Sequence, residues 1–296
     1  MKIKDKFEDY LQYLKQKGLT NHTIGEYRRF LYGALSHALL KDKNVKDLKL
    51  VDVVSVIESG KIHGEYGPQR AIVTLRRYLK FLKDSGIKLN FDWRDIEMPK
   101  VSEKEQDYLT EEEFNDFIEK IPLNTLYGLR DRTLYEVLFS TGARIGEMLS
   151  LKRSDIDWVK KEAKVKGKGG DEGMIYFSDR SLEWLKRYLE TRTDSCLALF
   201  VVYSFQGIVP LTKVNARKHL LKYRKIFGLE KKITHHAFRR SFCSLLLDKG
   251  ATIKEVQYLA RHKSERTTLR FYTKVEKRKA KETHQRIFGE SQKRSF

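Results

Sequence analysis

Apolar side chains recur at helical spacing through the first hundred residues. The first set, Phe7, Tyr10, Leu11 and Leu14, lies on one face of a helix. Three further sets follow the same spacing, and the last of them begins at Pro68, a residue suited to the first turn of a helix. Their members are Ile24, Tyr27, Leu31, Leu35 and Leu39; Val53, Val54 and Ile57; and Leu75, Tyr78, Leu79 and Leu82. The pattern predicts a helical N-terminal domain over residues 1–100.

A polar stretch marked by proline separates this region from the rest of the chain. Residues 97–107 hold few apolar side chains, which is typical of a linker, and we place the linker itself at residues 101–106. Thr110 and Glu113 then form a capping-box pattern in front of an apolar run, which marks the start of a helix. We therefore expect a second domain over residues 107–296.

The second domain is expected to contain both helices and strands. The helical segments end at Gly142, restart at Ile145, and return at 181–191, 213–227 and 237–247. Residues 163–177 break this spacing, because a glycine-rich centre lies between two apolar runs there. Such a segment predicts a β-hairpin or a small sheet. The expected fold class is therefore mainly α with a small β-sheet.

The charge balance favours a polyanionic partner. Sixty lysines and arginines against 40 acidic residues give a formal net charge of +20 and an isoelectric point near 9.7. A ribosomal protein, or a basic protein that is merely soluble, would have similar values. The N-terminal helices carry a set of basic residues that form either a solvated surface or a groove along DNA. They are Arg28, Arg29, Arg70, Arg76, Arg77 and Lys80.

Cysteine usage and hydropathy indicate a reducing compartment. The two cysteines, Cys196 and Cys243, form no CxxC pair, so we expect both thiols to be structural. The N-terminus is charged and lacks the apolar core of a secretory signal. No window is apolar over the length of a membrane span. The expectation is a cytoplasmic protein without a membrane partner.

Four residues near the C-terminus carry the candidate chemistry: His236, Arg239, His262 and Tyr272. A phenol flanked by cationic donors is suited to attack on a phosphodiester, which gives a covalent phosphotyrosine. No acidic residue of metal-binding spacing accompanies them, so we expect neither a metal nor another cofactor. Each residue alone has an ordinary interpretation, since lone histidines are usually structural and Tyr272 lies in a run that could belong to the core.

Two basic residues farther upstream are suited to the same chemistry. Arg144 follows a helix-ending glycine at the head of the next helix, where it can meet a phosphate or serve as a simple cap. Lys168 lies between glycines in a predicted hairpin tip, where a lysine can contact phosphate or protonate a leaving oxygen. The loop is not a P-loop, because the G-x-x-x-x-G-K-[ST] pattern is missing.

Four segments resemble the tyrosine recombinases, the phage-integrase and Xer-type family, in order and spacing: STGARIGEMLSL, VKGKGG, THHAFRRSF and LARHKSERTTLRFYTKV. The resemblance covers essentially the whole chain. It implies a helical core-binding domain followed by a mixed α/β catalytic domain. Position by position, it implies catalytic roles for Arg144, Lys168, His236, Arg239 and His262, with Tyr272 as the nucleophile. Glu147 matches the acidic position of the family after the first arginine, where it orients its neighbours.

The resemblance also implies an activity and partners. It predicts a site-specific recombinase that cleaves and rejoins double-stranded DNA at a specific recombination site through a 3′-phosphotyrosyl intermediate and a Holliday junction. A homotetramer would act on two DNA sites, with a C-terminal segment packed against a neighbouring protomer, and accessory proteins remain open as further partners. The alternatives are a type IB topoisomerase and a catalytically inactive architectural DNA-binding protein.

Three departures from the family pattern concern the neighbours of these residues. Arg240 replaces a histidine, and Arg261 stands where glycine commonly precedes the second histidine of the motif set. After the hairpin tip, Asp171, Glu172 and Gly173 follow where basic residues are usual. None of these changes removes a principal catalytic group.

Overall fold

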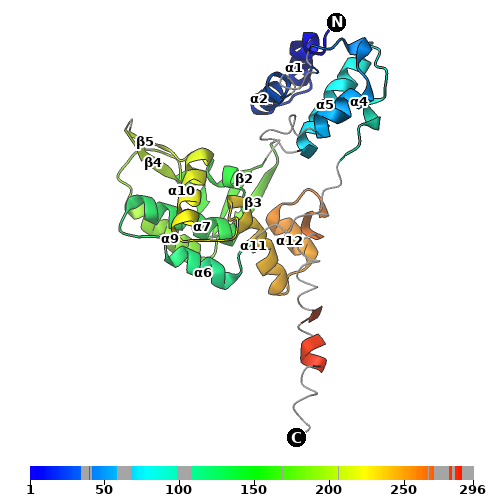
Figure 1. Ribbon diagram of the computed structural model, residues 1–296. Helices are drawn as coiled ribbons and strands as arrows, with labels where there is room; N and C mark the ends of the chain where they lie inside the picture. Colours follow the sequence, from blue (N-terminus) through cyan, green and yellow to red (C-terminus); the bar gives the residue numbers. More distant parts are fainter. Residues whose placement is uncertain are drawn as a thin grey trace. The chain divides into compact units, whose positions relative to one another are not determined.

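The chain forms two compact units, Met1–Lys104 and Glu105–Phe296. We describe them from a computed structural model (Figure 1). It describes residues 1–34, 40, 42–58, 68–98, 108–167, 170–205, 207–265, 267–269, 280–281 and 284–288. The expected linker at 101–106 lies outside the described residues, as do Leu35 and Leu39 of the second predicted helix.

The first unit is helical, as the apolar spacing predicts. Its helices are α1 (Phe7–Gln16), α2 (Asn21–Arg29), α4 (Leu50–Glu58) and α5 (Pro68–Asp84). Short helical turns flank them at Ile3–Lys6, Phe30–Ala34, Val45–Asp47 and Trp93–Asp95. Thr20 caps α2 by accepting a hydrogen bond from the backbone of Thr23. The predicted faces of α1 and α5 are buried, so their side chains form the core of this unit.

Aromatic rings hold α1 against α5. Phe7 meets Tyr78 edge to face with ring centroids 5.3 Å apart, and Tyr10 lies 5.1 Å from Phe81. The Tyr78 hydroxyl donates a hydrogen bond to the carbonyl oxygen of Ile3, which satisfies the polar end of a fully buried ring. Aromatic packing therefore joins α1 to α5, and the buried hydrogen bond ties α5 to the turn Ile3–Lys6 that precedes α1.

Several of the basic residues on these helices pair with acidic neighbours in the same unit. Arg28 lies 2.6 Å from Glu8, and Arg70 lies 2.9 Å from Glu26. Arg77 instead donates to the hydroxyl of Tyr27 at 2.6 Å. Because the ion pairs are solvent-exposed, each adds little to stability and can exchange partners readily. The groove along DNA that the sequence suggested remains a prediction.

The second unit surrounds a central helix. Its helices are α6 (Glu111–Glu119), α7 (Leu126–Thr141), α8 (Ile145–Met148), α9 (Asp179–Glu190), α10 (Lys213–Ile226), α11 (His235–Asp248) and α12 (Ile253–Ala260). The α7 helix is buried over most of its length and packs against α6, α9, α11 and β3 (Figure 1). It ends at Gly142, whose left-handed backbone (φ 59°) is the usual C-terminal cap of a helix. The predicted capping box of Thr110 and Glu113 opens α6, which confirms that helix start.

Two small antiparallel sheets complete the second unit. Strands β1 (Ile156–Asp157), β2 (Glu162–Lys166) and β3 (Glu172–Tyr176) form one sheet, and β4 (Val201–Ser204) and β5 (Gly207–Pro210) form the other. The β2–β3 hairpin, in which Ala163 faces Ile175, confirms the hairpin predicted for residues 163–177. Neither the β4–β5 hairpin nor α12 was predicted, because each is short and lacks a strong periodic signal. The fold class, mainly α with a small sheet, is confirmed.

The described residues include no helix that is long and apolar enough to span a bilayer.

Cys243 is buried on α11, and burial raises the pKa of its thiol to about 11. Cys196 is half-buried. A thiol held in its protonated form is a poor nucleophile, so a structural role suits Cys243.

Candidate active site

Arg239 lies at the centre of the candidate site, on the second turn of α11. Its guanidinium is buried, with 2% of the residue exposed. One N–H donates to the carbonyl oxygen of Gly142 at 2.7 Å, and another donates to the carbonyl oxygen of Ala260. These two carbonyls end α7 and α12, so Arg239 ties three helices together. Burial and the charge of Arg144 lower the pKa of Arg239 to about 10, and the side chain remains charged at pH 7.

Arg144 lies two residues after Gly142, the α7 cap, and is itself the N-cap of α8. Its backbone N–H donates to Glu147 at 2.9 Å, and its Nη1 donates to the other oxygen of the same carboxylate at 2.7 Å. The Arg144 side chain is 41% exposed, whereas that of Glu147 is 4% exposed. The expectation that Glu147 orients its neighbours remains a prediction, and this geometry supports it.

Glu147 stays ionised although it is buried. Burial alone would raise the pKa of its carboxyl group, but the two hydrogen bonds from Arg144 and the charge of Arg261 outweigh it and lower the pKa. Arg261 donates to Glu147 at 2.8 Å and also to the carbonyl oxygen of Met174 on β3 at 3.1 Å. The sequence marked Arg261 only as a departure from the family pattern, and this second partner of Glu147 was not predicted.

The two histidines approach Arg239 from different elements. His236 lies in the first turn of α11 and is exposed, and His262 is half-buried just after α12. Burial, followed by the charges of Arg239 and Arg144, lowers the pKa of His262 to about 4. Although much of the His236 residue is accessible to solvent, desolvation of its ring by neighbouring atoms and the charge of Arg240 lower its pKa, with smaller contributions from Arg239 and Arg144. The His262 imidazole is therefore neutral at pH 7.

Thr268 is a site neighbour that the sequence did not reveal. It is buried, and its hydroxyl lies 2.8 Å from Nδ1 of His262. A group that engages one ring nitrogen fixes the orientation of the imidazole and the role of the other nitrogen. Its place six residues after the histidine gave no signal, because threonines are common in such polar stretches.

The structure thus brings four of the six predicted residues together. Arg144, the α11 pair His236 and Arg239, and His262 come from three segments of the chain. Their proximity shows in the lowered pKa values of His236, Arg239 and His262, to each of which the charge of Arg144 contributes. Lys168 and Tyr272 lie outside the described residues. Within the described part of the chain, no group of three or more His, Cys, Asp or Glu residues is arranged to hold a metal ion. A cluster of cationic and neutral N–H donors is suited to binding an anion such as a phosphate.

A histidine next to the site leads to a pH prediction. His235 begins α11, and its Nε2 is buried without a hydrogen-bond partner among the described residues. Burial lowers its pKa to about 4, whereas an unfolded histidine titrates near ~6.5. As the pH falls, the unfolded chain therefore binds a proton at His235 before the folded chain does. The contribution of the neutral His235 to the unfolding free energy is fully present above pH ~6.5 and is lost as the pH drops toward 4. His235→Phe, with a ring suited to the nearby Tyr135, should raise the unfolding free energy at pH 7 by about 1 kcal/mol.

Thermal denaturation between pH 4.5 and 7.5 measures this effect. The melting temperature of His235→Phe should fall less steeply with acid than that of the wild type. Part of the slope should persist, because the pKa of His262 is lowered in the same direction. Identical slopes for both proteins would show that His235 does not contribute.

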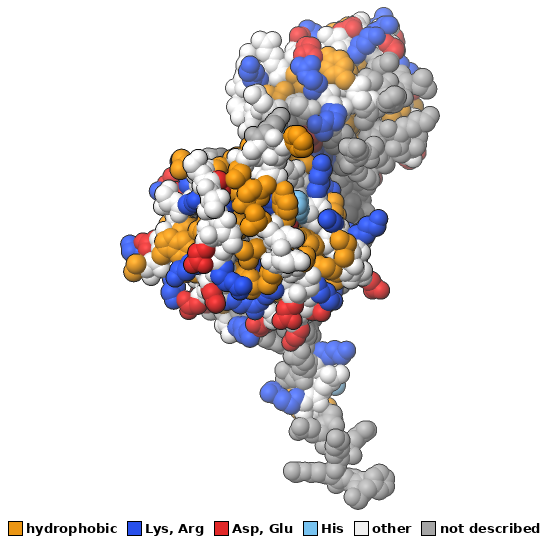
Figure 2. All heavy atoms as spheres, turned by 90° about the vertical axis from the view of Figure 1, so that its left-hand side faces the viewer, with side chains coloured by type: hydrophobic (Ala, Val, Ile, Leu, Met, Phe, Trp, Pro, Cys, Tyr) orange, Lys and Arg blue, Asp and Glu red, His pale blue; other side chains and the backbone are white. Residues whose placement is uncertain are grey.

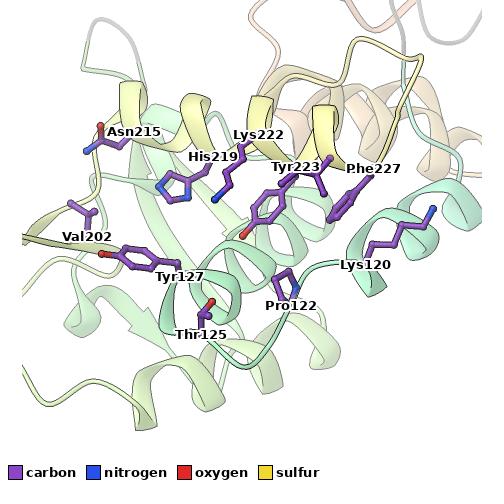
Figure 3. Close-up of a pocket in the computed structure, with 11 residues that line it drawn as sticks. Lys120, Pro122, Thr125, Tyr127, Val202, Asn215, His219, Lys222, Tyr223 and Phe227 are labelled. Carbon is purple, nitrogen blue, oxygen red and sulfur yellow. The ribbon is translucent and has the colours of Figure 1, made fainter.

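A pocket on another face of the second unit is separate from this site. It has a volume of about 730 Å³ and is lined mainly by α10 and the start of α7 (Figure 3). His219 points into it, with Nδ1 held 2.9 Å from the buried Asp131, and Tyr127 lies beside it. Figure 2 shows hydrophobic side chains gathered among basic ones over part of the molecular surface. None of the four described site residues lines this pocket, so it is not the anion-binding cluster.

Comparison with known proteins identifies the relatives of this chain. Residues 107–279 match the model of the phage integrase family. The tyrosine recombinase XerD of Staphylococcus epidermidis is 31% identical over 293 residues, which cover 91% of this chain and 94% of that protein.

Solved structures share the fold. A Tn1549 transposon integrase in complex with transposon right-end DNA has a TM-score of 0.75 at 19% identity, with 92% of this chain and 95% of that chain covered. A lambda integrase tetramer bound to a Holliday junction has a TM-score of 0.73 at 19% identity, with 90% and 78% covered. The chain belongs to the phage integrase family, as a tyrosine-type site-specific DNA recombinase.

Proposed function

We propose that this chain exchanges strands between two specific double-stranded DNA sites through a 3′-phosphotyrosyl intermediate formed by Tyr272. The observation that carries the proposal is the convergence of Arg144, Arg239 and His262 around the ends of α7 and α12, with the carboxylate of Glu147 behind Arg144.

Phosphate binding is the first role of this cluster. A guanidinium has five N–H donors, so the bond from Arg144 to Glu147 leaves further N–H groups that can reach a non-bridging phosphate oxygen. In the tautomer in which Thr268 donates to Nδ1 of His262, Nε2 carries the hydrogen and donates to the same phosphate. Each well-placed donor of this kind can lower the barrier by roughly 3–4 kcal/mol.

Proton transfer is the second role. The Tyr272 oxygen forms a bond to phosphorus as the bond from phosphorus to the 5′-oxygen breaks. The phenol, with an ordinary pKa near ~10, must lose its proton, and His236, whose pKa is lowered, is suited to accept it. Lys168 donates a proton to the departing 5′-oxygen. The phosphotyrosyl bond retains the energy of the phosphodiester, so the 5′-hydroxyl of a partner strand can reverse the attack.

The assembly we propose is a homotetramer on two DNA sites, with a Holliday junction as intermediate. The lambda integrase tetramer on a Holliday junction supports this model by its shared fold. Residues 1–100 would form the core-binding domain and residues 107–296 the catalytic domain. Ile287 and Phe288 are exposed within the described segment 284–288 and are suited to packing against a neighbouring protomer. The reaction would take place in the cytoplasm, on chromosomal or mobile DNA.

A nicked DNA substrate tests the proposal. Protection mapping on the DNA that flanks the native gene first locates the binding site. A duplex carrying that site with a nick beside the cleavage point should then trap a covalent protein–DNA adduct, and the DNA-linked tryptic peptide should contain Tyr272. Supercoiled plasmid without the site should stay supercoiled. The absence of an adduct, as expected of an architectural protein, or efficient site-independent relaxation, as expected of a topoisomerase, would contradict the proposal.

A further inference from the structure

Arg261 has a backbone conformation that favours glycine. Its φ and ψ are 53° and 50°, in the left-handed region, where it ends α12. Within the described part of the chain, Lys161 is the other non-glycine residue with a positive φ. A side chain at such a position is disfavoured by contact between its Cβ and the backbone, so an arginine there requires compensating contacts.

The Arg261 side chain makes such contacts with two other elements. Nη2 donates to Glu147 of α8 at 2.8 Å, and Nη1 donates to the carbonyl oxygen of Met174 on β3 at 3.1 Å. The carboxylate of Glu147 also accepts from Arg144. One side chain therefore joins the end of α12, the β2–β3 hairpin and the residue that orients Arg144.

Gly173 leaves the space through which this side chain passes. A Cβ placed on Gly173 would lie 2.5 Å from Cδ of Arg261, which is closer than such atoms approach in proteins. Gly173 has no positive φ, so its backbone does not require glycine. Both residues depart from the family pattern at their positions. In the structure they are complementary in shape, because the missing Cβ of Gly173 leaves room for the Arg261 side chain.

A second contact joins the same two segments near the hairpin tip. Lys263 forms an ion pair with Asp171, and the carbonyl oxygen of Asp171 accepts a hydrogen bond from the backbone N–H of Gly167 at 2.6 Å. Gly167 and Asp171 flank the segment of the sequence that contains Lys168. Two contacts therefore hold the β2–β3 hairpin to the segment around His262. Arg261 binds Met174 in strand β3, and Lys263 binds Asp171 near the tip of the hairpin.

We propose that Arg261 is a positioning residue that fixes the β2–β3 hairpin, and with it Lys168, relative to the phosphate-binding groups. This inference rests on the proposed function, because Lys168 acts there as the proton donor to the leaving 5′-oxygen. Arg261 touches neither DNA nor the reacting atoms in this scheme. Glu147 keeps both of its hydrogen bonds from Arg144 when the Arg261 side chain is removed, so the loss acts through the hairpin and should impair leaving-group protonation selectively.

The experiment compares two leaving groups in single-turnover cleavage. Arg261→Gly removes the side chain and keeps a residue that favours the backbone conformation. With an ordinary substrate its cleavage rate should fall roughly tenfold to a hundredfold, as expected for a proton donor displaced by about 1 Å, while DNA affinity is unchanged. With sulfur in place of the departing 5′-oxygen, the rate should approach that of the wild type. A thiol with a pKa near ~8.5 leaves as a thiolate without a proton donor.

Two variants serve as comparison and control. Arg261→Lys keeps a charge near Glu147 but cannot bond both Glu147 and Met174 through separate nitrogens, so its rate should be intermediate. Lys161→Gly removes the other basic residue of positive φ, together with its surface ion pair to Asp179, and should cleave at the wild-type rate.

A double-mutant cycle tests the contact itself. Gly173→Ala should slow cleavage in the wild-type background and cause no further loss in Arg261→Gly, because the clash partner is then absent. Additive effects of the two changes would contradict the inference, as would an Arg261→Gly defect that sulfur does not relieve. If the wild-type chain forms the adduct and Arg261→Gly cleaves the ordinary substrate at the same rate, this inference is wrong and the proposed function still holds. A wild-type chain without any adduct would instead contradict the proposed function.

Discussion

Tyr272→Phe is expected to bind the recombination site as tightly as the wild type and to form no covalent adduct with it. The substitution removes a single oxygen, which is the atom that would attack phosphorus, and it keeps the ring. Affinity comes mainly from contacts between basic side chains and DNA phosphates, which this change does not alter. The measurement is a gel-shift titration together with denaturing electrophoresis of the nicked-substrate reaction.

Tyr258→Phe is the matched control for this loss. Tyr258 is an exposed phenol on α12, and it lies near Tyr176 of β3. Its removal should leave the yield of adduct at the wild-type level. If Tyr272→Phe formed the adduct as readily as the wild type, the assignment of Tyr272 as the nucleophile would be wrong.

Arg239→Lys is expected to slow cleavage by roughly a hundredfold to a thousandfold, although it keeps the positive charge. An ammonium group cannot replace two guanidinium nitrogens that bond Gly142 and Ala260 while a further N–H reaches the phosphate. The buried carbonyl left without its donor should also lower the unfolding free energy by about 1–3 kcal/mol. Single-turnover cleavage and urea denaturation measure the two effects separately.

Arg192→Lys separates the chemical effect from the structural one. Arg192 is another buried arginine that donates to backbone carbonyls, those of Cys196, Ala198 and Leu199, away from the cluster of site residues. Its replacement should cost comparable stability and leave the cleavage rate of the folded protein unchanged. Equal rate losses in the two variants would mean that Arg239 acts only through folding.

The cationic cluster depends on one buried carboxylate for its electrostatic balance. Arg144, Arg239 and Arg261 repel one another, and Glu147 accepts hydrogen bonds from the first and the last of them. The site can thus present positive charge to a phosphate while its interior ion pairs remain satisfied. Desolvation, followed by the positive charges of the neighbouring arginines, lowers the pKa values of His236 and His262, so the histidines add no further positive charge to the cluster at pH 7.

Local chemistry made much of the second unit predictable. Thr110 and Glu113 opened α6 at the expected position, and Gly142 ended α7 where the glycine predicted it. These signals act within one helical turn, so they do not depend on the rest of the fold. The β4–β5 hairpin escaped prediction because its four-residue strands depend on pairing with each other.

The helical segments, the first hairpin, the charge and the order of the recombinase motifs follow from the amino-acid sequence, because spacing, caps and residue types are local properties. How the site residues are held follows from the packing of elements that are far apart in the chain. Arg239 and Gly142 are 97 residues apart, and Arg261 and Glu147 are 114 residues apart. A guanidinium chooses among many carbonyls and carboxylates by geometry, and that geometry exists only after α7, α11, α12 and β3 have packed. The same packing explains why an arginine, and not a glycine, occupies the left-handed position at the end of α12.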